Sequence, residues 1–142
     1  MKKNSSRFFF FLLLSLLPFG FYSCQETETE PDQTDPRDKY LGVWSVNEQW
    51  TKLTYEVNIT AISGSSTGIY IENFAASGSG VKTRAEVSGN YVEISPLPQT
   101  LSTGWIITSG SGALSGATKM NWDYVFDDQA NTYTATAVFT KK

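Results

Sequence analysis

The 142 residues include no histidine and a single cysteine. The lack of imidazole excludes histidine-ligated metal centres and nucleophilic systems that pair serine or cysteine with histidine. A helical period is also missing from the chain after residue 24, which argues against packed helices. The remaining carboxylates are scattered along alternating segments and indicate solvated faces, so we expect a non-catalytic, all-β protein without a metal or cofactor.

The chain begins with the features of a secretory signal. Two lysines and one arginine lie within the first seven residues, residues 8–22 are almost purely apolar, and Ser23 places a small residue before Cys24. An apolar run of about 15 residues is shorter than the roughly 20 that a membrane-spanning helix needs. We therefore predict that residues 1–23 are a signal peptide that is removed.

The pair Ser23-Cys24 resembles the end of the lipobox of bacterial lipoproteins. That resemblance implies that Cys24 is lipidated, becomes the mature N-terminus and anchors the protein to a membrane. An unpaired exported thiol fits this interpretation because it has no partner for an internal disulfide. An ordinary secretory signal and an N-terminal membrane anchor are the alternatives.

The segment after Cys24 is strongly acidic, with six carboxylates against Arg37 alone in residues 25–38. It contains no apolar group that could repay the entropy of ordering, so we predict that residues 24–38 are a lipidated cysteine and a disordered tether. An acidic stretch at this position also resembles the surface-export signal of Bacteroidota lipoproteins. It implies an outer-membrane protein at the cell surface, with a solvated spacer on a periplasm-facing lipoprotein as the alternative.

Residues 39–142 form the predicted folded domain. They carry seven Lys or Arg and eight Asp or Glu, so they are nearly neutral and lack the clustered basic stripe of a nucleic-acid partner. Alternating apolar and polar residues predict strands throughout, as in residues 53–61, 81–87 and 132–139. We expect eight strands, near residues 41–50, 53–62, 68–74, 81–87, 90–95, 103–109, 116–126 and 131–140, with turns between them that include residues 109–115.

Short connections predict that each strand pairs antiparallel with the next, and eight twisted strands can close and remove their edges. The predicted fold is an eight-stranded up-and-down barrel, with a β-sandwich as the alternative. In such a meander both chain ends emerge at one rim. The opposite rim then carries residues 50–52, 75–80, 96–101 and 127–131.

The motif Gly42-Val43-Trp44 at the start of the first strand resembles the G-x-W signature of lipocalins and calycins. Residues 40–46, 55–59, 71–74, 109–115 and 122–124, in this order behind a lipobox, are similar to segments of small lipocalin-like lipoproteins of Bacteroidota. The resemblance covers residues 40–142 and implies that Trp44 packs at the closed end of the barrel. It implies no particular ligand.

Three residues are the candidate ligand contacts: Glu48, Trp50 and Leu97. Glu48 shares a strand face with Trp44, so it points inward, where a carboxylate lies either near a wet barrel mouth or in a polar ligand contact. We predict a binding module for a small apolar or glycan ligand. A structural or protein-interaction subunit that meets an envelope protein is the alternative, favoured if the barrel is filled and exposes an apolar patch.

Overall fold

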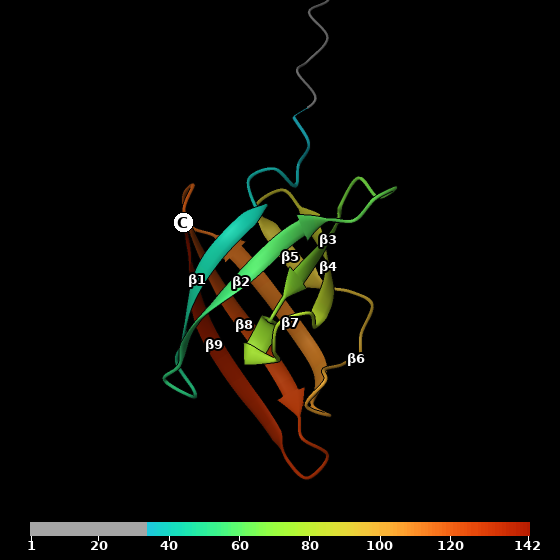
Figure 1. Ribbon diagram of the computed structural model, residues 1–142, viewed down its shortest axis with the longest axis vertical. Coiled ribbons are helices and arrows are strands. Elements are labelled where there is room, and N and C mark those ends of the chain that lie inside the picture. Colours follow the sequence, from blue (N-terminus) through green and yellow to red (C-terminus); the bar gives the residue numbers. More distant parts are fainter. Residues whose placement is uncertain (1–33) are drawn as a thin grey trace, which may run out of the picture. The chain divides into compact units, whose positions relative to one another are not determined.

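The computed structural model describes residues 34–142, which fold into strands joined mostly by short loops (Figure 1). One short 3-10 helix, η1 (Phe74–Ala76), interrupts the strand order within these residues. The strands in chain order are β1 (Gly42–Glu48), β2 (Thr54–Ala61), β3 (Gly68–Glu72), β4 (Lys82–Ser88), β5 (Tyr91–Ile94), β6 (Gln99–Thr100), β7 (Ile106–Leu114), β8 (Lys119–Asp127) and β9 (Thr132–Lys141). No helix among these residues is long and apolar enough to cross a membrane.

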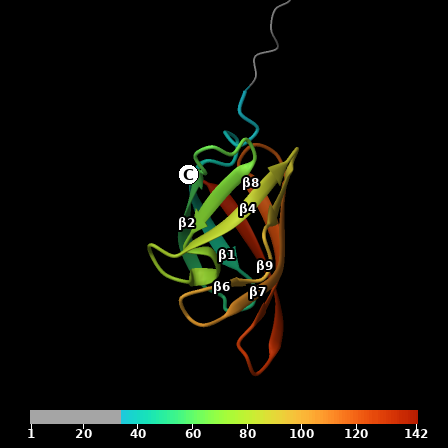
Figure 2. The same cartoon turned by 90° about the vertical axis from the view of Figure 1, so that its right-hand side faces the viewer.

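Eight of the strands form a closed circuit. The order is β5-β4-β3-β2-β1-β9-β8-β7, and β5 pairs with β7 to complete the ring. Every pairing is antiparallel, and the curved wall is visible from two sides in Figures 1 and 2. The prediction of an all-β, eight-stranded antiparallel barrel is confirmed. The β-sandwich alternative is excluded because the strands close into one continuous sheet and do not form two separate sheets packed face to face.

The barrel is filled by alternate side chains of its own strands. In β8 the buried residues Met120, Trp122, Tyr124 and Phe126 alternate with outward neighbours, and β9 repeats the pattern with smaller residues. The alternation with a period of two that the sequence predicts is therefore the alternation between core and surface residues. Large inward residues on β8 lie beside the small inward residues Ala135 and Ala137 of the neighbouring strand β9, and such alternation lets the interior pack without a wide central space.

The sixth predicted strand, residues 103–109, was placed wrongly. The structure has β7 at Ile106–Leu114, so most of the predicted turn at residues 109–115 is strand. Its two glycines are not turn residues but make room for inward side chains. A Cβ on Gly110 would lie 2.4 Å from Cδ1 of Ile94, and one on Gly112 would lie 2.5 Å from Cε2 of Trp122.

The two-residue strand β6 was not predicted. It pairs with the first residues of β7 outside the closed circuit. The amide of Gln99 accepts a hydrogen bond from the backbone N–H of Arg84 and donates one to its carbonyl, both at 2.8 Å. A side chain thus completes the edge of β4 where β5 has ended, which leaves less unpaired backbone in the wall.

The predicted strand at residues 68–74 ends earlier, at Glu72, and Phe74 enters the barrel instead. Asn73 takes a left-handed conformation with a φ of 65°. Its side chain donates to the carbonyl of Glu56 at 2.8 Å and accepts from the N–H of Gly78 at 2.8 Å. The backbone therefore turns inward, and the fully buried ring of Phe74 lies 5.1 Å from Trp122 and 4.9 Å from Tyr124.

The last residues of the predicted tether are ordered at the barrel end. Arg37 donates through Nε to Asp35 at 2.9 Å and through Nη1 to the carbonyl of Ile62 at 2.9 Å. Residues 36–38, which the sequence analysis assigned to the tether, form turns here, and Arg37 donates to the carbonyls of Ile62 and Gly68 at the connection between β2 and β3. The rest of the predicted tether and Cys24 lie outside the described residues.

Candidate functional site at the distal rim

The strand directions separate the barrel into two ends. Residues 34–41 and the C-terminus lie at one end, here called the tethered end (Figure 1). The loops at the other end comprise residues 49–53, 73–81, 95–105 and 128–131, and we call them the distal rim. Loops on a rigid barrel are the usual place for recognition, and these are the loops expected from the sequence to lie opposite the chain ends.

Three aromatic rings form a row inside the distal end, here called the aromatic stack. Phe126 stacks on Trp105 with a centroid distance of 4.6 Å and an interplanar angle of 9°, and on Tyr133 at 5.2 Å and 24°. Trp105 comes from the β7 side and Tyr133 from β9, and β8 lies between those strands. The two neighbours therefore cover opposite faces of Phe126.

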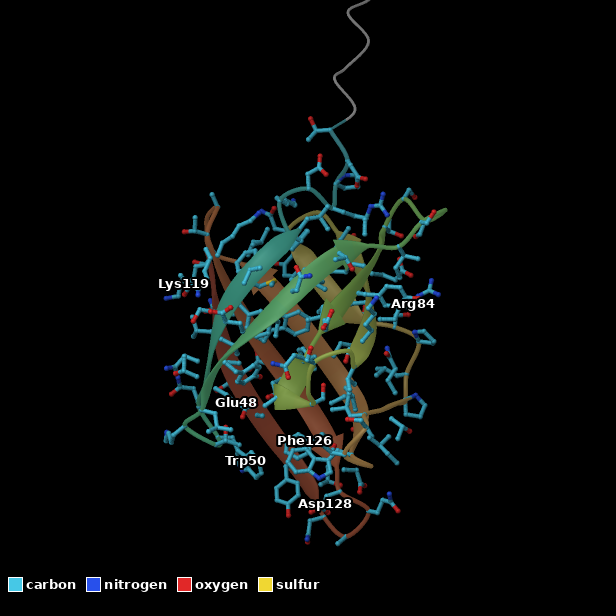
Figure 3. All side chains as sticks on the ribbon, viewed as in Figure 1. Glu48, Trp50, Arg84, Lys119, Phe126 and Asp128 are labelled. Carbon is cyan, nitrogen blue, oxygen red and sulfur yellow. The ribbon has the colours of Figure 1, made fainter. Side chains whose placement is uncertain are left out.

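Trp50 lies across the aromatic stack. Its ring is inclined by 72° to both Phe126 and Trp105, with centroid distances of 5.1 and 6.1 Å. Because both faces of Phe126 are covered by its stacked neighbours, only the edge of Phe126 can meet Trp50. Trp50 therefore packs on the stack and remains 43% exposed. Trp50 and Phe126 lie together at the distal rim in Figure 3.

Glu48 lies beneath this loop and is 3% exposed. Its Oε1 accepts a hydrogen bond from the Tyr124 hydroxyl, and its Oε2 accepts one from the Thr51 hydroxyl. The inward orientation predicted for Glu48 is correct, but both carboxylate oxygens have partners inside the protein. Glu48 connects the Trp50-bearing loop to β8 and so serves as a positioning residue in this structure.

The β8–β9 loop is held rigidly beside the aromatic stack. Asp128 accepts the N–H groups of Ala130 and Asn131 at 2.9 and 2.7 Å, and it accepts the hydroxyl of Tyr133 at 3.1 Å. The backbone donors hold the pKa of Asp128 below its usual value, and the bond to Asp128 raises the pKa of Tyr133. Asp128 therefore remains ionised near neutral pH, next to the stack.

The other predicted residues come from other parts of the chain. Leu97 is 40% exposed and lies on the loop of residues 95–105, whereas Trp50 lies on the loop of residues 49–53. Trp44 lies near the tethered end, fully buried, and its Nε1–H donates to the carbonyl of Tyr40 at 2.7 Å. Of the three candidate ligand contacts, the structure brings Glu48 and Trp50 together through residues 49–51 and leaves Leu97 on a separate loop.

The sequence analysis did not single out Trp105 and Tyr133. Phe126 was not singled out either, and Tyr133 was covered only by the alternating range of residues 132–139. Trp105 lay inside the strand predicted at residues 103–109, whereas in the structure it comes directly before β7. The signal available in the sequence was an aromatic residue near the same end of three consecutive strands, but this signal depends on the correct register of β7.

The interior also contains polar atoms that lack partners. Tyr55 Oη, Ser77 Oγ, Thr83 Oγ1 and Trp122 Nε1 are buried and have no hydrogen-bond partner in residues 34–142. Burial, with the nearby charge of Glu48, raises the pKa of Tyr55. These four groups mark the interior as incompletely satisfied in hydrogen bonds.

A shallow pocket of about 170 Å³ lies on the outer wall over β1 to β3. Two carboxylates line it, but Glu56 pairs with Lys142 and Glu72 accepts the N–H of Gly80 at 2.8 Å. Residues 34–142 contain no group of three or more histidine, cysteine or acidic side chains placed to hold a metal ion.

The closed circuit of eight antiparallel strands defines the class of this chain: it is a small all-β barrel of lipocalin-like architecture. Among solved structures, EF1p2_mFAP2b bound to DFHBI is similar with a TM-score of 0.53 and 14% identity, over 77% of this chain and all of the other. A redesigned beta barrel, b11L5F_LGL, has a TM-score of 0.52 and 12% identity, over 78% of this chain and 97% of that one. No protein-family model matches the chain. No curated protein matches it either. These likenesses concern the fold alone.

Proposed function

We propose that this protein is a membrane-anchored lipoprotein of the outer membrane, exposed at the cell surface, that acts as a non-catalytic binding module. Its distal rim takes a small apolar or glycan ligand. The observation that carries the proposal is Trp50, whose ring packs on the aromatic stack while 43% of the residue remains exposed. A large exposed aromatic residue held rigidly at a rim is a typical recognition group.

The proposed anchor is the lipid on Cys24, with residues 1–23 removed and the acidic segment after Cys24 as spacer. Several acyl chains on one cysteine would hold the barrel stably at a leaflet. We also propose that the protein is related to the small lipocalin-like lipoproteins of Bacteroidota. The acidic segment favours a location at the cell surface over a periplasm-facing one. In this arrangement the tethered end faces the membrane and the distal rim faces outward.

Metabolic labelling with a palmitate analogue tests the anchor. The wild-type chain should be labelled and Cys24→Ser should not, and an unlabelled wild type would refute lipidation. Protease treatment of intact cells then tests the location, because a surface protein is digested without permeabilisation. Survival until the outer membrane is opened would favour the periplasm-facing alternative.

Ligand binding is tested by native mass spectrometry of protein purified from its own host. A retained small molecule on the wild type that is lost from Trp50→Ala supports the proposal. The likeness to EF1p2_mFAP2b, a barrel solved with DFHBI bound, makes a ligand-binding barrel a reasonable expectation for this chain. It does not indicate which ligand.

The second candidate is a structural or protein-interaction subunit of an envelope complex. It is favoured by the filled interior, in which Phe74 packs against Trp122 and Tyr124. Exposed apolar residues at the distal rim add to this, with Leu53 50% and Leu97 40% exposed. A reproducible co-purifying envelope protein, with no retained small molecule, would select this candidate.

A further inference from the structure

We take the exposed surface of Trp50 to be the ring face that points away from the aromatic stack, here called the platform. The platform suits one of the two ligand classes that the proposed function leaves open better than the other. The platform is an open surface and not the wall of an enclosed pocket, because the space behind it is filled by the aromatic stack. An apolar ligand gains its binding energy from the area that it removes from water, and tight sites enclose most of the ligand. On the platform such a ligand would bury one face and leave the other in water.

A pyranose ring suits an open platform because its two sides differ in chemistry. The face of an indole ring carries partial negative charge, which attracts the weakly positive C–H groups on one face of a sugar. The sugar hydroxyls on the other side and at the edges remain hydrated or bond to polar neighbours. The ligand therefore loses little when only one face is covered.

The groups around the platform can bond hydroxyls. Asp128 lies next to it, since it accepts the hydroxyl of Tyr133, whose ring is 5.2 Å from Trp50. The neighbouring Gln129 is fixed by a hydrogen bond from its Nε2 to the carbonyl of Gly104 at 3.1 Å, beside Trp105. A carboxylate and amides accept and donate to neutral hydroxyls, whereas the ionised Asp128 would repel the carboxylate of an acidic sugar.

We infer that the distal rim binds a neutral oligosaccharide, with one pyranose ring stacked on the outward face of Trp50 and its hydroxyls directed to Asp128. This inference rests on the proposed binding function and names the ligand class. Glu48 contributes by holding the loop of Trp50 through Thr51 and not by touching the sugar. An open, single-ring contact of this kind gives weak binding, with a Kd of about 0.1–1 mM.

The test is titration calorimetry with the chain from Gln25 to Lys142, which contains every residue that the structure describes. The neutral probes are cellohexaose, maltohexaose and mannohexaose, the acidic probe is a galacturonate hexamer, and the apolar probe is N-phenyl-1-naphthylamine. We expect at least one neutral hexasaccharide to bind and the galacturonate to bind at least about tenfold more weakly.

Three variants locate the site. Trp50→Ala should weaken the neutral sugar at least about tenfold, whereas Trp50→Tyr, which keeps an aromatic face, should recover part of the loss. Tyr91→Ala is the matched control, because Tyr91 is an aromatic residue 66% exposed at the tethered end, and it should bind like the wild type. Circular dichroism of each variant confirms that the barrel is folded.

The failures are distinguishable. Binding of the naphthylamine that depends on Trp50, without binding of any neutral sugar, would overturn the glycan inference and leave the proposed binding function standing. Equal binding of the sugar by Trp50→Ala and wild type would overturn the platform as its site. Binding of neither kind of probe, together with a co-purifying protein, would overturn both the inference and the proposed function.

Discussion

Glu48 is a carboxylate at an inward position of β1, surrounded by aromatic and apolar side chains. Its two oxygens accept the hydroxyls of Tyr124 and Thr51, so the buried group is satisfied inside the protein. The alternation along β1 was enough to predict its orientation. Its partners are 3 and 76 positions away in sequence, and the distant one depends on the register around the whole barrel.

Glu48→Ala should lower the free energy of unfolding by about 2–4 kcal/mol, because the buried Tyr124 hydroxyl and the partly buried Thr51 hydroxyl lose their acceptor and a buried side chain is removed. Glu48→Gln keeps one oxygen acceptor and should cost less than half as much. Urea unfolding followed by circular dichroism measures both. Equal stability of Glu48→Ala and the wild type would show that the carboxylate does not hold the loop of Trp50.

Gly112 leaves room for the side chain of Trp122, because a Cβ on Gly112 would lie 2.5 Å from the indole ring. Gly112→Ala should destabilise the barrel by about 1–3 kcal/mol, because Trp122 is fully packed and cannot move away easily. Ser111→Ala, at the exposed neighbouring position of β7, is the control and should change stability by less than about 0.5 kcal/mol. Thermal unfolding compares the two, and an unchanged midpoint for Gly112→Ala would contradict the close packing.

The glycines of β7 show where local patterns were misleading. Serine and glycine alternate over residues 109–112, and this composition is typical of turns. In the structure these glycines lie in strand β7, because the large side chains of Ile94 on β5 and Trp122 on β8 occupy the space that a Cβ on Gly110 or Gly112 would need. Strands with self-contained alternation, such as β2 and β9, were predicted within about two residues of their observed limits.

At the scale of elements, η1 closes the interior. Phe74 fills the space between Trp122, Tyr124 and Phe139, with centroid distances of 5.1, 4.9 and 6.3 Å. Nothing in the local sequence distinguishes Phe74 from the end of an alternating strand. Its insertion depends on the two hydrogen bonds of the Asn73 side chain and on the space left inside the barrel.

Phe74→Ala should destabilise the protein by about 3–5 kcal/mol, because it leaves a cavity among three aromatic rings. Ala76→Gly in the same segment is the control. Ala76 is exposed and has a φ of 53°, so glycine relieves backbone strain there and should be neutral or stabilising by up to about 1 kcal/mol. Chemical unfolding measures the stability of both variants. A small effect of Phe74→Ala would mean that the Phe74 ring is not tightly packed inside the barrel.

At the scale of the whole molecule, the barrel joins two ends with different tasks. The tethered end fixes the chain as it enters the barrel, through Arg37, Asp35 and the carbonyls of residues 62 and 68. The distal rim carries the platform. The sequence predicted the two ends from strand number alone, whereas the aromatic stack that makes the platform depends on contacts across β7, β8 and β9.

The contact between Asp35 and Arg37 predicts a pH dependence. The Arg37 guanidinium and backbone lower the pKa of Asp35 from 3.8 to about 2. A carboxyl with a depressed pKa in the folded state contributes stability above its unfolded pKa, and this contribution is lost as the pH falls from about 4 to about 2. Asp35→Asn should reduce the pH dependence of the free energy of unfolding in that pH window and leave it unchanged outside the window. An NMR titration of Asp35 with a midpoint near 4 would contradict the contact.

The central claim is that recognition occurs on the outward face of Trp50 and not inside the filled barrel. The most direct measurement is a ¹H–¹⁵N NMR titration of the indole N–H signals, because the chain has only four tryptophans. With a neutral hexasaccharide we predict that the Trp50 signal shifts most and Trp105 less, while those of Trp44 and Trp122 remain in place. A shift of Trp122 with an unchanged Trp50 signal would place the ligand beside Phe74 in the interior and contradict the claim.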